Sequence, residues 1–94
     1  MRIVSFRNRE LERLWRSNES RGVARQYEGK LRAMLTAIEE AEKMAELVTV
    51  PGWRLHPLKG DRRGIWSMTI TRNHRLTFRV DGQTISEIDF EDYH

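Results

Sequence analysis

The chain has 94 residues, no cysteine and a formal net charge of +3. This length suits one domain, 1–94, with a small hydrophobic core, and the absence of cysteine excludes disulfides, thiolate metal sites and a cysteine nucleophile. No apolar run is long enough to span a bilayer, and charge interrupts the first residues too early for a signal peptide, so we expect a cytoplasmic protein.

The charges are segregated along the chain. Residues 51–80 hold seven Lys and Arg and one acid, a net charge of +6, whereas residues 81–94 hold five acids and no Lys or Arg, a net charge of −5. Arginine outnumbers lysine 14 to 3. The guanidinium group offers a fixed fork of donors to phosphate oxygens. The composition therefore favours a polyanionic partner modestly over a solvated basic surface.

The first half of the chain predicts a short strand and two helices. Residues 3–6 are a strand candidate, and Asn8 is placed to cap a short amphipathic helix over 9–17. Apolar residues spaced by three and four predict a second helix from about 23 to 47, although Gly29 weakens its early turns. That helix must end before Pro51.

The second half of the chain predicts antiparallel strands. Apolar residues alternate in two segments: Trp66, Met68 and Ile70, then Leu76, Phe78 and Val80. A three-residue turn over 72–74 places Ile70 opposite Leu76 and Met68 opposite Phe78, so that both rows share a face, whereas a two-residue turn over 73–74 would separate them. We therefore expect the three-residue turn, with Arg75, Thr77 and Arg79 on the other face.

A last strand is expected over 84–90, after a hairpin turn at Asp81 and Gly82. Ile85 and Ile88 have opposite parity, which predicts a bulge in that strand. The fold class is therefore α+β: a short N-terminal strand and a two-helix hairpin packed on a largely antiparallel sheet of about four to five strands.

Generic motifs for chemistry are weak. Histidines 56, 74 and 94 are spaced by 18 and 20 residues, which matches no common metal-ligand pattern. Residues 60–64 contain two glycines and two arginines but lack the ending of a phosphate-binding P-loop, so they predict a mobile basic loop. The chain end, Asp92, Tyr93 and His94, is unusually polar and aromatic.

Four motifs together give a specific resemblance: Trp53-Arg54-Leu55-His56-Pro57-Leu58-Lys59-Gly60, Gly64-Ile65-Trp66-Ser67, Arg75-Leu76-Thr77-Phe78 and Asp92-Tyr93-His94. The chain resembles the HigB branch of the RelE-like toxins over essentially its whole length. The resemblance implies a RelE-like fold and a toxin of a type II toxin-antitoxin system that cleaves mRNA in the ribosomal A site. Cleavage would use the 2′-hydroxyl of the RNA, leaving a 2′,3′-cyclic phosphate and a 5′-hydroxyl, with no metal or other cofactor.

By the same resemblance, acid-base and substrate-positioning roles fall on His56, Asp92, Tyr93 and His94. Phosphate binding falls on Lys59 and Arg75, and further RNA contacts are expected from Arg54, Arg62 and Arg63. A histidine suits either proton role near neutrality, so which one is base and which is acid stays open. One departure is His74, where family members commonly have tryptophan or tyrosine, and it is expected to weaken a stacking contact.

Simpler interpretations exist for each residue taken alone. His56 could be an ordinary loop histidine, Lys59 a solvated surface lysine, and Arg75 an ion-pair partner of Glu87 or Asp89. Two other functions stay open: a ParE-like inhibitor of DNA gyrase, and a non-catalytic RNA-binding module. The expected partners are a HigA-type helix-turn-helix antitoxin, the ribosome and mRNA, and we expect neither a membrane nor a small-molecule ligand.

Overall fold

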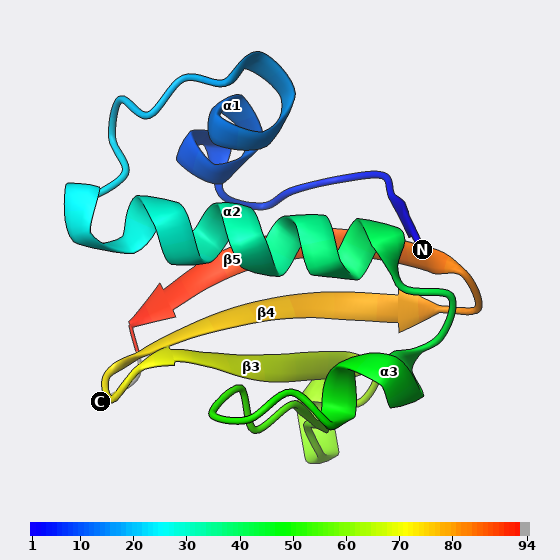
Figure 1. Ribbon diagram of the computed structural model, residues 1–94. Coiled ribbons are helices and arrows are strands. Elements are labelled where there is room, and N and C mark those ends of the chain that lie inside the picture. Colours follow the sequence, from blue (N-terminus) through cyan, green and yellow to red (C-terminus); the bar gives the residue numbers. More distant parts are fainter. Residues whose placement is uncertain (93–94) are drawn as a thin grey trace.

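The computed structural model describes residues 1–92 and contains one five-stranded sheet with α1 and α2 on one face (Figure 1). In chain order the elements are β1 (Arg2–Ile3), α1 (Arg9–Ser17), α2 (Arg25–Glu40), α3 (Met44–Val48), β2 (His56–Pro57), the 3-10 turn η1 (Gly60–Arg62), β3 (Ile65–Thr71), β4 (His74–Asp81) and β5 (Thr84–Asp92). The sheet order is β1-β5-β4-β3-β2, with β1 parallel to β5 and the other pairs antiparallel. The predicted α+β architecture is confirmed. Among residues 1–92, no helix is both long and apolar enough to cross a membrane.

The core fills the space between the two longer helices and the sheet. Its fully buried side chains come from α1, α2 and the three long strands: Leu11, Leu14, Leu31, Met34, Leu35, Ile38, Met68, Ile70, Leu76, Phe78, Ile85 and Ile88. The spacing in the helices is three and four and that in the strands is close to two, as an amphipathic layer against a sheet requires.

Helix α1 forms where the sequence predicts it. The Asn8 side chain accepts a hydrogen bond from the backbone N–H of Leu11 at 2.9 Å, which satisfies one of the unpaired donors of the first turn. The helix ends at Asn18, whose left-handed backbone lets its N–H donate to the carbonyl of Arg13. The predicted boundaries 9–17 are confirmed.

The single long helix predicted for 23–47 is wrong in its last part. Helix α2 stops at Glu40, Ala41 is extended with ψ of 143°, and the short α3 follows from Met44. The ammonium group of Met1 donates to the carbonyl oxygens of Ile38 (3.1 Å) and Glu39 (2.7 Å), which gives the helix end alternative partners. The break thus depends on a contact between residues almost 40 positions apart.

The turn between β3 and β4 also differs from the prediction. Thr71 pairs with His74, leaving a two-residue turn, and a register shift lies between Thr69 and Thr71. Met68 therefore pairs with Leu76 and not with Phe78, a shift of two positions. Because two residues are one full period of a strand, the predicted division of side chains between the two faces still holds.

The bulge predicted in the last strand is confirmed. Ile85 and Ile88 are both fully buried, and the pairing between β4 and β5 shifts between Thr77 and Arg79. Two residues of β5 thus lie opposite one of β4, and Glu87 takes a positive φ of 54°. The bulge returns Ile88 to the core and sets which acids of β5 face away from the helices.

Candidate active site

We call the sheet face turned away from α1 and α2 the polar face, defined by Ser67, Thr69, Arg75, Thr77 and Arg79. Directly opposite residues of neighbouring strands project from the same side of a sheet. Ser67 and Thr77 are 3% exposed although they are polar, so other side chains cover the middle of this face.

His56 lies on the edge strand β2 and pairs with Ser67, which in turn pairs with Thr77, and Thr77 with Asp89. These pairings set one cross-strand row of polar residues on the polar face. The His56 ring is exposed, and its Nδ1 lies 2.7 Å from the carbonyl oxygen of Arg54. A carbonyl oxygen only accepts, so Nδ1 carries the proton, and the neutral ring presents an unprotonated Nε2.

The segment around His56 is shaped by its backbone. Arg54 has a positive φ of 48°, and Leu55 is buried in the core, so the chain turns sharply just before the histidine. Lys59 immediately precedes η1 and is exposed, as are Arg54 and Arg63. Three cations with water-accessible side chains therefore flank the histidine, an arrangement suited to a polyanion.

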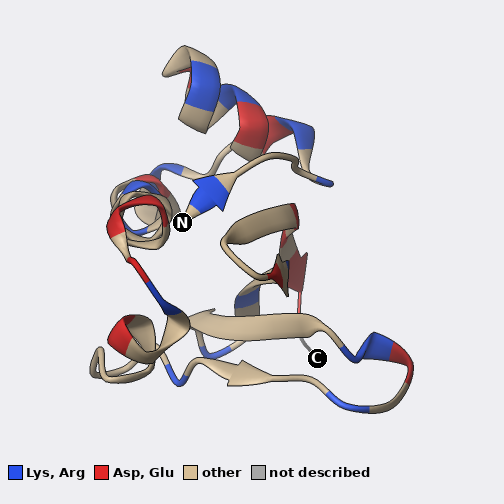
Figure 2. Cartoon of the chain, turned by 90° about the vertical axis from the view of Figure 1, so that its right-hand side faces the viewer, with Lys and Arg blue, Asp and Glu red and all other residues tan. Residues whose placement is uncertain are grey.

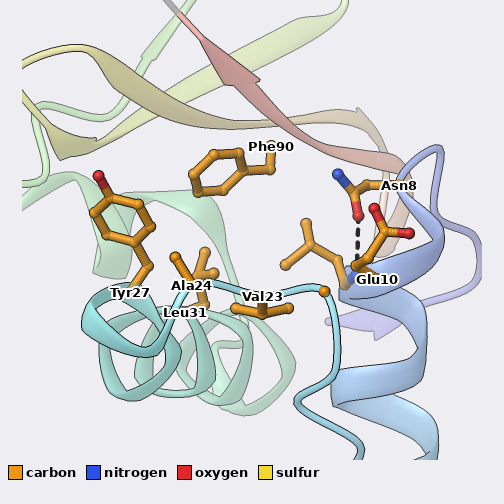
Figure 3. A pocket seen from close by; sticks show the side chains of 9 residues that line it. Asn8, Glu10, Val23, Ala24, Tyr27, Leu31 and Phe90 are labelled. Carbon is orange, nitrogen blue, oxygen red and sulfur yellow. Dashed lines mark hydrogen bonds between the residues drawn. The ribbon is translucent and has the colours of Figure 1, made fainter.

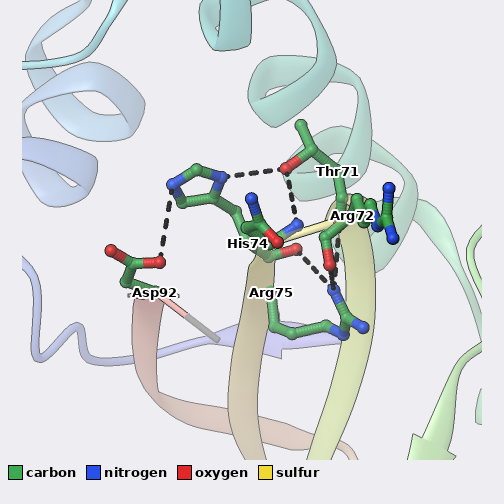
Figure 4. Close-up of polar contacts among 6 residues, drawn as sticks. Thr71, Arg72, His74, Arg75 and Asp92 are labelled. Carbon is green, nitrogen blue, oxygen red and sulfur yellow. Dashed lines mark hydrogen bonds and ion pairs between the residues drawn. The ribbon is translucent and has the colours of Figure 1, made fainter. Parts of the chain in front are cut away.

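Arg75 and Asp92 lie together at the end of the sheet formed by the β3–β4 turn (Figure 4). The Nη1 atom of Arg75 donates to the carbonyl oxygens of Thr71 at 2.9 Å and of His74 at 3.1 Å. Asp92 pairs with His74 across the strands, and its exposed Oδ1 lies 4.0 Å from the Nε2 of His74. The pairings of Arg75 with Glu87 or Asp89 that the sequence left open are not the contacts seen at this guanidinium.

Arg62 is engaged by an acid that the sequence did not single out. Its guanidinium makes a bidentate contact with Glu91, and the Thr77 hydroxyl donates to the same carboxylate at 2.5 Å. The Arg62 hydrogen bond is the main cause that holds the pKa of Glu91 below its usual range, against the opposing effect of burial. Arg79 is paired in the same way with Glu87 at 2.7 Å. The segregated charges of the sequence are thus partly neutralised across the sheet.

A cavity of about 150 Å³ opens on the polar face and is lined by Arg7, Asp61, Arg62, Ile65, Thr77, Arg79, Glu87 and Glu91. Its lining holds three arginines and three acids, so it has no strong preference for an anion as it stands. The loop of residues 59–63 that contributes part of this lining projects beyond β2 and β3, at a distance from α1 (Figure 2). Within residues 1–92, no group of three histidine or acidic side chains is arranged to hold a metal ion.

The predicted residues form two groups in the described part of the chain. His56 and Lys59 lie at the β2 edge, and Arg75 and Asp92 lie at the turn end of β4 and β5. Two strands separate β2 from β5, which places their backbones roughly 14 Å apart at the usual strand spacing. Tyr93 and His94 lie outside the described residues. Whether the chain end completes one pocket with His56 thus stays a prediction.

His74 remains part of an aromatic cluster despite replacing a larger aromatic residue. Its ring lies 5.1 Å from that of Tyr27 on α2 and 5.1 Å from that of Phe90 on β5. Tyr27 and Phe90 also border a cavity of about 80 Å³ between α1, α2 and β5 (Figure 3). The stacking contact expected to weaken is therefore present in this form.

Comparisons with known proteins agree with the fold and extend over the whole chain. The family model of the RelE-like toxin of type II toxin-antitoxin system HigB matches residues 4–94. The chain is 37% identical over 92 residues to the endoribonuclease HigB of Proteus vulgaris, which covers 98% of this chain and 99% of that protein.

Solved structures show the same fold at lower identity. A YoeB/ParE toxin from Agrobacterium tumefaciens aligns with a TM-score of 0.60 at 22% identity, over 97% of this chain and 99% of that one. A YoeB dimer from Staphylococcus aureus aligns with a TM-score of 0.63 at 19% identity, over 100% and 97%. At these identities the structures bear on the fold alone. Because the family model and the Proteus relative each span nearly the whole chain, the protein belongs to the HigB-like family of RelE-like toxins of type II toxin-antitoxin systems.

Proposed function

We propose that the protein is a metal-independent endoribonuclease that cleaves mRNA on the ribosome. The single observation that carries this proposal is the 37% identity, over nearly the full length of both chains, to a protein named an endoribonuclease. The four motifs of the resemblance lie within the matched region 4–94. A cytoplasmic location follows from the same proposal, because translating ribosomes are there.

In the proposed reaction, His56 is the general base. Its unprotonated Nε2 takes the proton of the ribose 2′-hydroxyl, and the 2′-oxygen attacks the adjacent phosphorus. The bond from phosphorus to the 5′-oxygen of the next nucleotide breaks, which leaves a 2′,3′-cyclic phosphate and a 5′-hydroxyl. The hydrogen bond from Nδ1 to the Arg54 carbonyl supports this role, since it fixes the tautomer that a base needs.

The acid and the cations come from the other motif residues. By resemblance, His94 would protonate the leaving 5′-oxygen, Tyr93 would stack on a base, and Asp92 would orient the chain end. Lys59 and Arg75 would stabilise negative charge on the non-bridging oxygens. The separation of β2 from β5 supports a division of labour in which His56 and Asp92 act on different atoms of the RNA.

An antitoxin of the HigA type is the proposed protein partner. The support is the family itself, which is defined as the toxin half of a type II toxin-antitoxin system. Ribosomal RNA and mRNA are the proposed nucleic-acid partners. The exposed cations Arg54, Lys59 and Arg63 support a salt-dependent affinity for both.

Substitutions in ribosome-programmed cleavage reactions test the proposal. His56→Ala and Asp92→Asn should each slow cleavage by roughly 100-fold or more while the protein still co-sediments with ribosomes. Asp81→Asn is the matched control, because Asp81 lies at the opposite end of the long strands in the β4–β5 turn. Cleavage at the unaltered rate by both His56→Ala and Asp92→Asn would contradict the assigned site.

A further inference from the structure

We propose that His74 is a positioning residue that orients the carboxylate of Asp92. The inference rests on the proposed function, in which Asp92 serves the cleavage site. It adds to that function a residue outside the acid, base and phosphate-binding set. The support is a chain of polar contacts that runs from the β3–β4 turn through the His74 ring to Asp92 (Figure 4).

The chain of contacts has a direction. The backbone N–H of Asn73 donates to the Thr71 hydroxyl oxygen at 3.3 Å, and that oxygen lies 2.8 Å from the Nδ1 of His74. With one lone pair used by Asn73, the Thr71 hydroxyl donates its own proton to Nδ1. The proton of the neutral ring is then on Nε2, the atom that faces Oδ1 of Asp92 at 4.0 Å. His74 is thus the opposite tautomer to His56.

The ring is held and the carboxylate is not. Tyr27 and Phe90 contact the imidazole from α2 and β5, and the His74 side chain is 22% exposed. The Asp92 side chain is 61% exposed, so water surrounds most of its possible orientations. A fixed donor beside an exposed carboxylate favours the orientation that brings them together.

The neighbouring cation is directed elsewhere. Arg75 adjoins His74 in sequence, but its Nη1 donates to carbonyl oxygens of the turn, including that of Thr71. These bonds stiffen the turn that places Thr71 against the imidazole. The imidazole, and through it the aromatic cluster, therefore has the geometry to set the direction of Asp92.

Cleavage kinetics test the inference through His74→Phe, which keeps a ring against Tyr27 and Phe90 but removes both nitrogens. We expect the single-turnover cleavage rate to fall roughly 10-fold with ribosome affinity unchanged, because misdirection of a group acts on the chemical step. Thr71→Val should have a smaller effect of the same kind. In the Asp92→Asn background, His74→Phe should cause no further loss. An equal fold-loss in both backgrounds would overturn the inference. A melting temperature close to that of the parent protein confirms that each variant folds.

A spectroscopic measurement separates this inference from the proposed function. Nitrogen-15 spectra of the histidine rings, recorded about two pH units above the ordinary histidine pKa of about 6.5, report the tautomers directly. His74 should be protonated on Nε2, and its resonances should move in Asp92→Asn, while those of His56 should not. Unmoved His74 resonances overturn the inference whatever the cleavage result. Moved resonances together with full cleavage by Asp92→Asn would instead overturn the proposed role of Asp92.

Discussion

Replacing Glu91 by glutamine tests whether the loop of residues 59–63 is tied to the sheet. The substitution removes the charge that receives two hydrogen bonds from Arg62 and one from Thr77. Hydrogen bonds to a charged group contribute about 1.5–3 kcal/mol. The Arg62 side chain is 42% exposed and that of Glu91 23%, so solvent screening lowers this figure. We expect a loss of about 1 kcal/mol in the free energy of unfolding at pH 7.

The loss should depend on pH in a defined direction. The folded-state pKa of Glu91 is lowered, so its stabilising effect is fully present above the unfolded value of about 4.3 and disappears as pH falls through the lower folded value. Urea denaturation of the parent protein and Glu91→Gln should therefore show curves that separate at pH 7 and converge in acid.

A matched control distinguishes this tie from ordinary surface pairing. Glu87→Gln breaks the pair with Arg79, whose two side chains are 43% and 39% exposed, and should cost about 0.5 kcal/mol or less. If Glu91→Gln costs no more than Glu87→Gln at pH 7, or costs the same amount at pH 7 and in acid, the reasoning about Glu91 is refuted.

Two further predictions address the first helix and the basic loop. Asn8→Ala removes the cap of α1 and should lower the free energy of unfolding by about 1 kcal/mol in urea titrations, and an unchanged midpoint would show that the cap contributes nothing. Lys59→Ala should weaken ribosome binding and reduce the magnitude of the slope of log affinity against log salt by about one. Lys43→Ala, in the exposed segment between α2 and α3, should leave both unchanged, and equal effects of the two lysine variants would remove the loop from the RNA contacts.

Short-range patterns in the sequence predicted much of the fold. Asn8 identified the start of α1 because its capping bond is local, and the opposite parity of Ile85 and Ile88 identified the bulge in β5. Contacts distant in sequence were not predictable in this way. The end of α2 depends on Met1, and the β3–β4 register depends on a shift near Ile70 that the alternation of apolar residues does not encode.

The candidate site was predictable as a set of residues but not as a geometry. The motifs named His56, Lys59, Arg75 and Asp92, yet the tautomer of His56 follows only from the turn that brings the Arg54 carbonyl to its ring. Glu91 was missed because its partner Arg62 lies 29 positions away, in a loop whose path no pattern of the sequence fixes. Opposite charges on β4 and β5 were the only signal that could have suggested such pairs.

The most direct test of the proposed nuclease is to map the 5′ ends of an mRNA after incubation with the purified protein, with and without translating ribosomes. We predict new ends that carry a 5′-hydroxyl, opposite 2′,3′-cyclic phosphates, only in the reaction with ribosomes. A message that stays intact in both reactions, alongside inhibition of supercoiling by DNA gyrase, would contradict the proposal and favour the inhibitor alternative.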